Sequence, residues 1–309
     1  MLKRIALSSI VFVALAAPGV AQTSSDLQSS VALFQKVRTV PNLVYQRVNG
    51  WDGKLDVYAQ RTEAPAPTVI FIHGGGWVRG TKEASVLTVL PYIAMGYSVV
   101  NVEYRLAEVS LAPAAIEDCR CALRWVVEHA KEYNFDATRL IVAGASAGGH
   151  LALTTGMIPT SAGFDRSCQT PAEPRVAAIV NFFGITDVAD LLDGPNKKPF
   201  PEGWPYTVQW LGNQPNRADV AKASSPLTYV RAGVPPTISI HGDADPLVPY
   251  QQSVAMEAAL RSAGTPVKLV AVPGGVHGAD FGAAGKSHPE WPNYYAETVA
   301  WFDKYLRAR

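Results

Sequence analysis

The sequence predicts an α/β fold with a mostly parallel central sheet and helices on both faces. Short apolar runs rich in β-branched residues are typical of strands that are covered on both faces. Stretches with helical periodicity lie between these runs, and such alternation favours parallel strand order. The chain has 309 residues and is 48% hydrophobic, so it has enough apolar material to bury a sizeable core.

The expected elements follow one another along the chain. Runs 43–48 and 54–59 resemble an N-terminal hairpin, joined through the turn-rich stretch 49–53. The remaining expected strands are residues 68–72, 98–102, 140–143, 176–182, 237–240 and 267–272. The expected helices are residues 114–133, 148–156, 254–263 and 293–307.

One segment interrupts the alternation. Residues 185–229 are rich in proline and too long for an ordinary connection. We therefore expect a short cap inserted over one end of the sheet, with residues 22–309 forming a single domain.

The first residues have the layout of a secretory signal. Lys3 and Arg4 precede the largely apolar run 5–17, and small residues at 19–21 suit cleavage. The run is too short for a membrane-spanning helix, although an uncleaved anchor is the alternative. We expect residues 1–21 to be removed, and the mature chain to be periplasmic or secreted without stable membrane insertion.

Export makes a disulfide feasible. Cys119 falls on the apolar face of its predicted helix and is expected to be buried, which leaves a Cys121–Cys168 bridge as one option. No cysteine or histidine cluster suggests a metal, and we expect no cofactor. The formal net charge of +1 provides no basic footprint for nucleic acid. The oligomeric state is left open.

A serine stands between glycines at the end of one apolar run. Residues 144–148 read GASAG and fit G-x-S-x-G, after a predicted strand and before a predicted helix. In that context a tight turn exposes the serine hydroxyl above the sheet edge. The pattern favours Ser146 as a nucleophile, and a simple glycine-rich turn is the alternative.

Two later loops supply the groups that a serine nucleophile needs. Asp245 and His277 each follow a predicted strand, so both lie at the carboxyl edge of the sheet. Asp245 would orient His277, which would accept the Ser146 proton, and the order Ser, Asp, His is that of α/β-hydrolases. The competing candidates are histidines 129, 241 and 288 and aspartates 187 and 243.

A glycine-rich loop precedes the serine. Residues 73–77 read HGGGW directly after an apolar strand and leave backbone amides unshielded by side chains. With the amide of Ala147, these groups would stabilise an oxyanion. A flexible loop is the alternative interpretation.

These motifs together resemble the HGGG-type esterases related to hormone-sensitive lipase, an α/β-hydrolase family. The motifs are HGGGW (73–77), GASAGG (144–149), HGDADPLVP (241–249) and GGVHG (274–278), and the resemblance runs from about residue 50 to 308. The bacterial branch of secreted acetyl xylan and feruloyl esterase-like proteins is the most similar. The resemblance implies Ser146, Asp245 and His277 as catalytic residues. It further implies Gly75, Gly76 and Ala147 as oxyanion donors, with His73 and Glu117 as structural supports.

Two departures from the family leave the substrate open. The stretch 108–110 reads EVS where the family commonly has Pro-Glu, and the cap is short. The aromatic residues Trp77, Trp204, Tyr206 and Trp210 would line an acyl or sugar cleft, or would pack the core of the cap.

The sequence therefore predicts a serine carboxylesterase that acts through an acyl-enzyme. Short-chain acyl esters and acetyl or feruloyl esters linked to polysaccharide are the expected substrates. A serine peptidase or amidase and a non-catalytic binding module are the alternatives, because the same triad serves amide hydrolysis.

Overall fold

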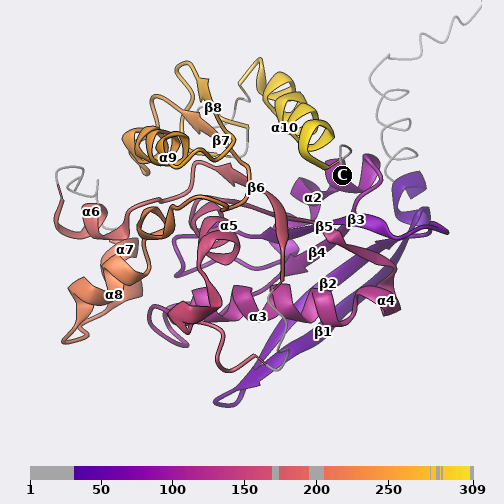
Figure 1. The fold of residues 1–309 in the computed structure, drawn as a ribbon, viewed down its shortest axis with the longest axis horizontal. Coiled ribbons are helices and arrows are strands. Elements are labelled where there is room, and N and C mark those ends of the chain that lie inside the picture. The colour runs from indigo at the N-terminus through magenta and orange to yellow at the C-terminus, as the bar shows by residue number, and fades with distance from the viewer. Residues whose placement is uncertain are drawn as a thin grey trace, which may run out of the picture.

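The computed structural model describes residues 31–168, 174–194, 205–278, 280–282, 286 and 288–306. Within them the strands form one eight-stranded sheet in the order β1-β2-β4-β3-β5-β6-β7-β8 (Figure 1). The hairpin strands β1 (Val37–Val48) and β2 (Trp51–Gln60) are antiparallel to each other, and β2 is antiparallel to β4. The other strands pair in parallel, so the predicted sheet type is confirmed. These strands are β3 (Ala66–Ile72), β4 (Ser98–Val102), β5 (Phe135–Ala145), β6 (Val176–Phe182), β7 (Thr237–Gly242) and β8 (Val267–Val272).

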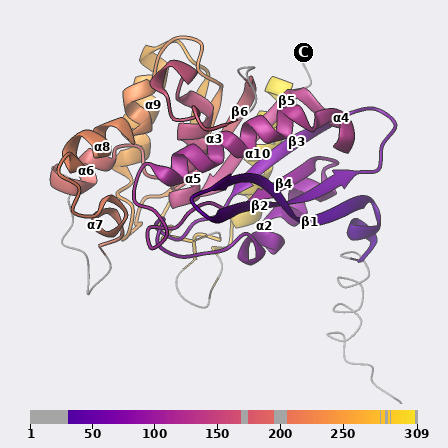
Figure 2. The same ribbon diagram turned by 90° about the horizontal axis from the view of Figure 1, so that it is seen from below.

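The central strands are buried on both faces, which explains their uninterrupted apolar runs. In β3, Ile70 and Ile72 belong to one core cluster, and Val69 and Phe71 belong to the other. Figure 2 shows α3 and α5 on one side of the sheet and α2 on the other. Core residues of α9 join the cluster beneath α3 and α5, whereas those of α10 join the α2 cluster. The bounds are α2 (Val86–Ala94), α3 (Ala114–Glu128), α5 (Ala147–Met157), α9 (Gln251–Ser262) and α10 (Trp291–Leu306).

Three local differences from the expected elements have physical reasons. The hairpin turn is tighter than expected: Asn49 and Gly50 both have positive φ (49° and 79°), as in a type I′ turn, and β2 begins at Trp51. The expected helix 114–133 breaks at His129 into α3 and α4 (Ala130–Tyr133). Helix α2 was not expected, because Pro91 inside it removes the helical signature.

The segment between β6 and β7 forms short helices rather than one extended loop. In both views α6, α7 and α8 gather at one end of the molecule (Figures 1 and 2). The phenol of Tyr206 in this segment donates to the Leu247 carbonyl at 3.0 Å, which holds the segment against the loop after β7. The elements are α6 (Val188–Asp193), α7 (Tyr206–Leu211), α8 (Arg217–Ala223) and the 3₁₀ turn η3 (Pro226–Tyr229).

The expected signal at residues 1–21 lies outside the described residues. Among the helices that the structure does describe, none has both the length and the apolar character needed to cross a bilayer.

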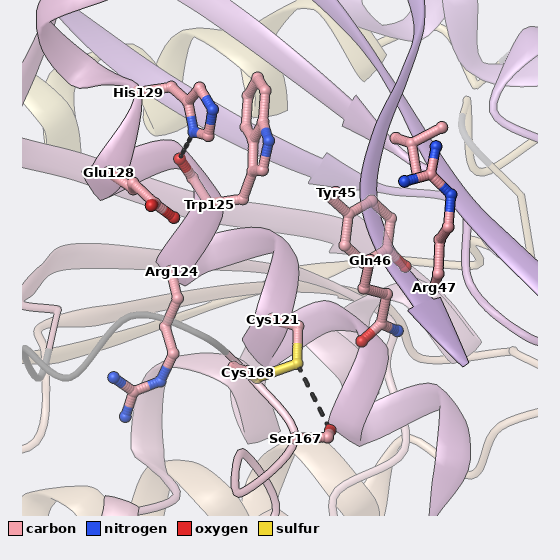
Figure 3. A pocket seen from close by; sticks show the side chains of 11 residues that line it. Tyr45, Gln46, Arg47, Cys121, Arg124, Trp125, Glu128, His129, Ser167 and Cys168 are labelled. Atoms are coloured by element: carbon pink, nitrogen blue, oxygen red, sulfur yellow. Dashed lines mark hydrogen bonds between the residues drawn. A yellow bond between two sulfur atoms is a disulfide. The ribbon is translucent and has the colours of Figure 1, made fainter.

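A disulfide and a buried ion cluster fix the chain after α5 to α3. Cys121 and Cys168 are joined with their Cα atoms 5.1 Å apart (Figure 3), which was one of the options left open. Cys119 is buried, as expected, and its thiol is free. Nearby, the guanidinium groups of Arg120 and Arg124 each donate to the Asp165 carboxylate at 2.6 Å. The bridge and the ion cluster therefore hold the same loop at two points.

Replacing both bridged cysteines by serine (Cys121→Ser with Cys168→Ser) should lower the free energy of unfolding. The bridge closes a loop with a sequence separation of 47, and in the chain-entropy model such a closure is worth about 4 kcal/mol. Denaturant unfolding of the double variant measures the loss. Cys119→Ala is the matched control, because it removes a thiol from the same helix without opening the loop. An equal loss in both proteins would contradict an effect of the bridge.

Candidate active site

Ser146 stands on a strained turn between β5 and α5. Its backbone has φ 57° and ψ −122°, a positive-φ conformation that costs a non-glycine residue roughly 1–3 kcal/mol. The turn is held because the Ser146 amide donates to the Phe182 carbonyl at 2.9 Å, and the His150 amide donates to the Ser146 carbonyl at 3.0 Å. The serine therefore sits at the N-terminus of α5, at the carboxyl edge of the sheet.

The glycines beside Ser146 are required by close backbone approach. A Cβ at Gly148 would lie 2.0 Å from the Ile72 carbonyl oxygen, and one at Gly144 would lie 2.3 Å from the Gly148 carbonyl oxygen. These atoms are backbone and have little freedom to move away. The G-x-S-x-G spacing thus lets β5, α5 and the end of β3 meet at one point.

The structure brings the three predicted triad residues together. His277 Nε2 is 3.0 Å from Ser146 Oγ, and His277 Nδ1 is 2.7 Å from Asp245 Oδ2. Because an ionised carboxylate only accepts hydrogen bonds, Nδ1 carries the proton and Nε2 is left to accept from the Ser146 hydroxyl. The hydroxyl, the imidazole and the carboxylate form one continuous hydrogen-bonded chain.

Asp245 is buried, and several donors surround its carboxylate. Oδ1 accepts from the amides of Leu247 (2.8 Å) and Val248 (2.9 Å), while Oδ2 faces His277 and also lies 3.3 Å from His241 Nε2. Burial by itself raises the pKa of Asp245, but the hydrogen bonds from the two histidines, the charge interaction with His277 and the Val248 amide together lower the pKa well below its usual value. Asp245 therefore stays ionised beside the imidazole.

His241, one of the competing histidines, supports the carboxylate from its other side. Its Nε2 lies near two acceptors, Asp245 Oδ2 and the Val248 carbonyl (3.1 Å), so it carries the proton. Its Nδ1 then accepts from the Ser253 hydroxyl at 2.7 Å. His241 therefore holds the Asp245 loop in place.

The remaining alternative residues have local structural contacts. His129 stacks on Trp125 with ring centroids 4.1 Å apart, and His288 donates to the Pro273 carbonyl at 3.1 Å. Asp243 accepts from the Gly274 amide at 2.7 Å, and Asp187 caps α6 through the Asp190 amide. Of the candidates weighed, His277 is the one that hydrogen-bonds to Ser146.

The HGGGW loop lies directly against the serine. A Cβ at Gly74 would approach the Ser146 Cβ at 3.4 Å and the Ala145 carbonyl oxygen at 2.8 Å. Gly75 and Gly76 have φ of 122° and 61°, and the Gly75 carbonyl accepts from the amides of Val78 and Arg79. Among the described residues, no backbone acceptor pairs with the amides of Gly75, Gly76 or Ala147. These are the three amides that the family resemblance implies as oxyanion donors.

The two supporting residues implied by the family resemblance have different surroundings. His73 is buried, stacks on Tyr104 with centroids 4.3 Å apart, and donates from Nδ1 to the Gly74 carbonyl at 2.7 Å. The carboxylate of Glu117 accepts from Arg105 at 3.3 Å. His73 therefore supports the glycine loop from within, whereas Glu117 supports the ion pair between Arg105 and Asp118.

Phe183 is a site residue that the sequence analysis missed. It has φ 42°, directly after β6, and its buried ring packs edge-on against the His277 ring at 4.7 Å between centroids. The Phe183 ring also packs against Phe281, with ring centroids 5.4 Å apart. Phe183 is therefore held in place and limits the rotation of the His277 ring on that side. Its place at the carboxyl end of a predicted strand, before Gly184, was the available signal.

The structure favours the packing interpretation for two of the predicted cleft tryptophans. Trp77 and Trp210 are both 0% exposed and stack on each other with centroids 4.2 Å apart. Tyr206 packs against Trp77 at 5.8 Å. Trp204 lies outside the described residues. Both described tryptophans join the cap to the HGGGW loop as part of the core, because neither ring has a face open to solvent.

A separate hollow lies away from the triad. It measures about 460 Å³ and is formed by β1, α3 and the chain at Ser167 and Cys168 (Figure 3). Figure 3 shows Trp125 and His129 stacked on one side and the disulfide on another. None of the triad residues lines it.

Stability should fall in mild acid because two histidines are buried in neutral form. Burial lowers the pKa of His73 and of His150 from 6.5 to about 4, although a backbone hydrogen bond opposes the shift in each. Between about pH 6.5 and pH 4, His73 and His150 are therefore protonated in the unfolded chain but remain neutral in the folded protein. The contribution of each histidine, up to ~3 kcal/mol, is complete above pH 6.5 and is lost as the pH falls through this window.

Chemical denaturation between pH 7.5 and pH 4.5 measures this loss. His150→Gln is the matched control: its stability should fall less steeply with acid than that of the wild type. The difference between the two slopes isolates one histidine from the carboxyl groups that titrate nearby. Identical slopes would show that His150 is not buried in neutral form.

A serine on a strand-to-helix turn, with an aspartate and a histidine after later strands of the same parallel sheet, defines an α/β-hydrolase. The glycine loop after β3 places it among the HGGG type. The chain belongs to the BD-FAE family, whose model matches residues 55–260.

Relatives and solved structures agree with this assignment. The probable carboxylic ester hydrolase LipM of Mycobacterium tuberculosis is 32% identical over 72% of this chain and 52% of its own length. Esterase 2 of Thermogutta terrifontis superposes with a TM-score of 0.68 at 25% identity, covering 88% of this chain and 93% of that one. A carbohydrate esterase from gut microbiota gives a TM-score of 0.71 at 25% identity, covering 86% and 95%. The chain spans a little over half the length of LipM and of two other curated esterases that it matches.

Proposed function

We propose that this chain is a serine carboxylesterase that hydrolyses carboxylic esters through an acyl-enzyme. The observation that carries the proposal is the hydrogen-bonded chain from Ser146 Oγ through His277 to Asp245, with distances of 3.0 Å and 2.7 Å. Ser146, His277 and Asp245 are the proposed catalytic residues. The esterase names of the relatives support the same reaction class.

In the first half-reaction Ser146 Oγ attacks the ester carbonyl carbon. His277 Nε2 takes the hydroxyl proton, and the imidazolium that forms is stabilised by the ionised Asp245. The carbonyl oxygen becomes an oxyanion, to which the backbone amides of Gly75, Gly76 and Ala147 would donate hydrogen bonds. When the tetrahedral intermediate collapses, the bond to the alcohol oxygen breaks and His277 returns its proton to that oxygen.

In the second half-reaction water replaces the alcohol. His277 removes a proton from the water as its oxygen attacks the acyl carbon, and the same amides hold the second oxyanion. Collapse releases the carboxylic acid, and the proton returns to Ser146 Oγ. Neutral His277 is required at the start of each half-reaction.

The proposed substrates are small acyl esters or acetyl and feruloyl esters linked to plant cell-wall polysaccharide. The likeness to a carbohydrate esterase from gut microbiota supports the second class. We further propose that the chain is exported and works in the periplasm or outside the cell. The Cys121–Cys168 bridge supports export, because disulfides persist mainly in oxidising compartments.

A panel of acetyl, butyryl, octanoyl and feruloyl esters tests the proposal and ranks the acyl groups. Peptide and anilide substrates in the same panel test the peptidase or amidase alternative. Turnover of esters with little or no turnover of amides is expected. Absence of ester hydrolysis, together with no labelling of Ser146 by a fluorophosphonate, would favour a binding module.

A further inference from the structure

One buried histidine connects three parts of the site that are distant in sequence. His150 lies in α5, four residues after Ser146, and is 0% exposed. Its Nδ1 is 3.2 Å from the indole Nε1 of Trp77, and its Nε2 is 2.7 Å from the Ser224 carbonyl. The first contact reaches the glycine loop, and the second reaches the end of the cap.

These contacts determine which ring nitrogen carries the proton. The indole N–H of Trp77 only donates, so His150 Nδ1 must accept and be unprotonated. The Ser224 carbonyl only accepts, so Nε2 carries the proton. The ring is thus neutral with one proton position, and each nitrogen has a partner.

Trp77 passes this restraint on to the oxyanion loop. It follows Gly76 directly, and its backbone is held with φ 61° although it has a bulky side chain. Its carbonyl accepts from the Ala107 amide at 2.9 Å, and its ring is enclosed by Trp210 and His150. Such a conformation persists only where the surroundings enforce it. The His150 bond is the polar restraint on the indole.

We propose that His150 is a positioning residue that fixes the oxyanion amides relative to Ser146 through its hydrogen bond with Trp77. Helix α5 begins directly after Ser146 and contains His150, whose Nδ1 accepts the hydrogen bond from Trp77 in the glycine loop. The same helix therefore positions both the nucleophile and the amides that would donate to the oxyanion. This role rests on the proposed esterase function, because its consequence is a property of the acylation step.

Two substitutions of His150 separate its two bonds. In His150→Asn the side-chain oxygen can occupy the place of Nδ1 and accept from Trp77, but it does not reach Ser224. In His150→Gln the amide nitrogen can reach the Ser224 carbonyl, but no acceptor remains beside Trp77. We expect kcat to fall about tenfold in His150→Gln, a fraction of the roughly 10²–10³-fold that removal of a whole oxyanion donor costs. His150→Asn should stay within about threefold of the wild type, since it keeps the acceptor.

Trp77→Phe removes the same hydrogen bond from the other end while keeping an aromatic ring against Trp210. If the bond is the link, His150→Gln, Trp77→Phe and the double variant should show similar losses in kcat, with KM changed less than about twofold. Additive losses, losses confined to KM, or a lower melting temperature with unchanged kcat would overturn the proposal. Rates are normalised to folded protein by near-ultraviolet circular dichroism.

A measurement on the wild type keeps the test independent of the esterase activity. Nitrogen NMR of labelled histidine should show His150 protonated at Nε2 only, and the Trp77 indole N–H should exchange slowly with solvent. If the wild type shows both signals but hydrolyses no ester, the proposed esterase function fails while the His150–Trp77 restraint stands. A His150 ring protonated at Nδ1, or rapid exchange of the Trp77 indole, would overturn the restraint itself.

Discussion

Ser146→Ala should lower kcat for ester hydrolysis by at least about 10⁴-fold, because no other nucleophile occupies its place beside His277. Ser146 Oγ hydrogen-bonds to the His277 ring at 3.0 Å. Without this oxygen no acyl-enzyme can form, and the ester can react only by direct attack of water. KM should change little, since alanine removes one oxygen atom and leaves the turn intact. Steady-state hydrolysis of a p-nitrophenyl acyl ester measures the loss, and a fluorophosphonate should no longer label the protein.

Ser161→Ala is the control for this variant, because Ser161 is exposed on the 3₁₀ turn η2 (Thr160–Ala162), within the described part of the chain. Its activity and its labelling should match the wild type. Activity of Ser146→Ala within tenfold of the wild type, or labelling at another residue, would remove Ser146 as the nucleophile.

Asp245→Asn should lower kcat by about 10⁴-fold with little change in KM, as loss of the orienting carboxylate does in serine triads. An asparagine amide can donate to His277 Nδ1, which moves the imidazole proton to Nε2. Nε2 can then no longer accept the Ser146 proton. The buried carboxylate would also be absent when the imidazolium forms. The same ester assay measures this effect.

Asp243→Asn is the matched control, two residues earlier in the same loop. The Asp243 carboxylate accepts from the Gly274 amide, and an amide oxygen can accept the same bond. We expect its kcat within about threefold of the wild type. Equal losses in the two variants would show that the loop, rather than the Asp245 carboxylate, controls the rate.

The sheet could be predicted closely because each strand appears in the sequence as a short apolar run. Strands β4, β6 and β8 begin and end at the predicted residues. The candidate site could be predicted for a related reason: each triad residue follows such a run, and the carboxyl ends of parallel strands share one edge. The place of each triad residue after a predicted strand was therefore enough to predict that the three residues lie at the same edge of the sheet.

The contacts that shape the site could not be predicted in the same way. Phe183 against His277 and His150 against Trp77 join residues that are far apart in the sequence and belong to different elements. No local pattern marks such pairs. Helix α2 was hidden by Pro91, and the cap helices α6, α7 and α8 are too short for periodicity to show. The burial of Trp77 and Trp210 follows from this cap packing.

Hydrogen bonds within the protein itself fix the shape of the glycine loop. Backbone bonds from Val78 and Arg79 close it on Gly75, and the Ala107 amide secures Trp77 behind it. A preorganised anion site needs no contribution from substrate binding to form, so distant groups on the substrate are not required to assemble it. If the proposed function holds, an acetyl ester, which offers few contacts of its own, would meet the same complete set of catalytic groups as a much larger ester.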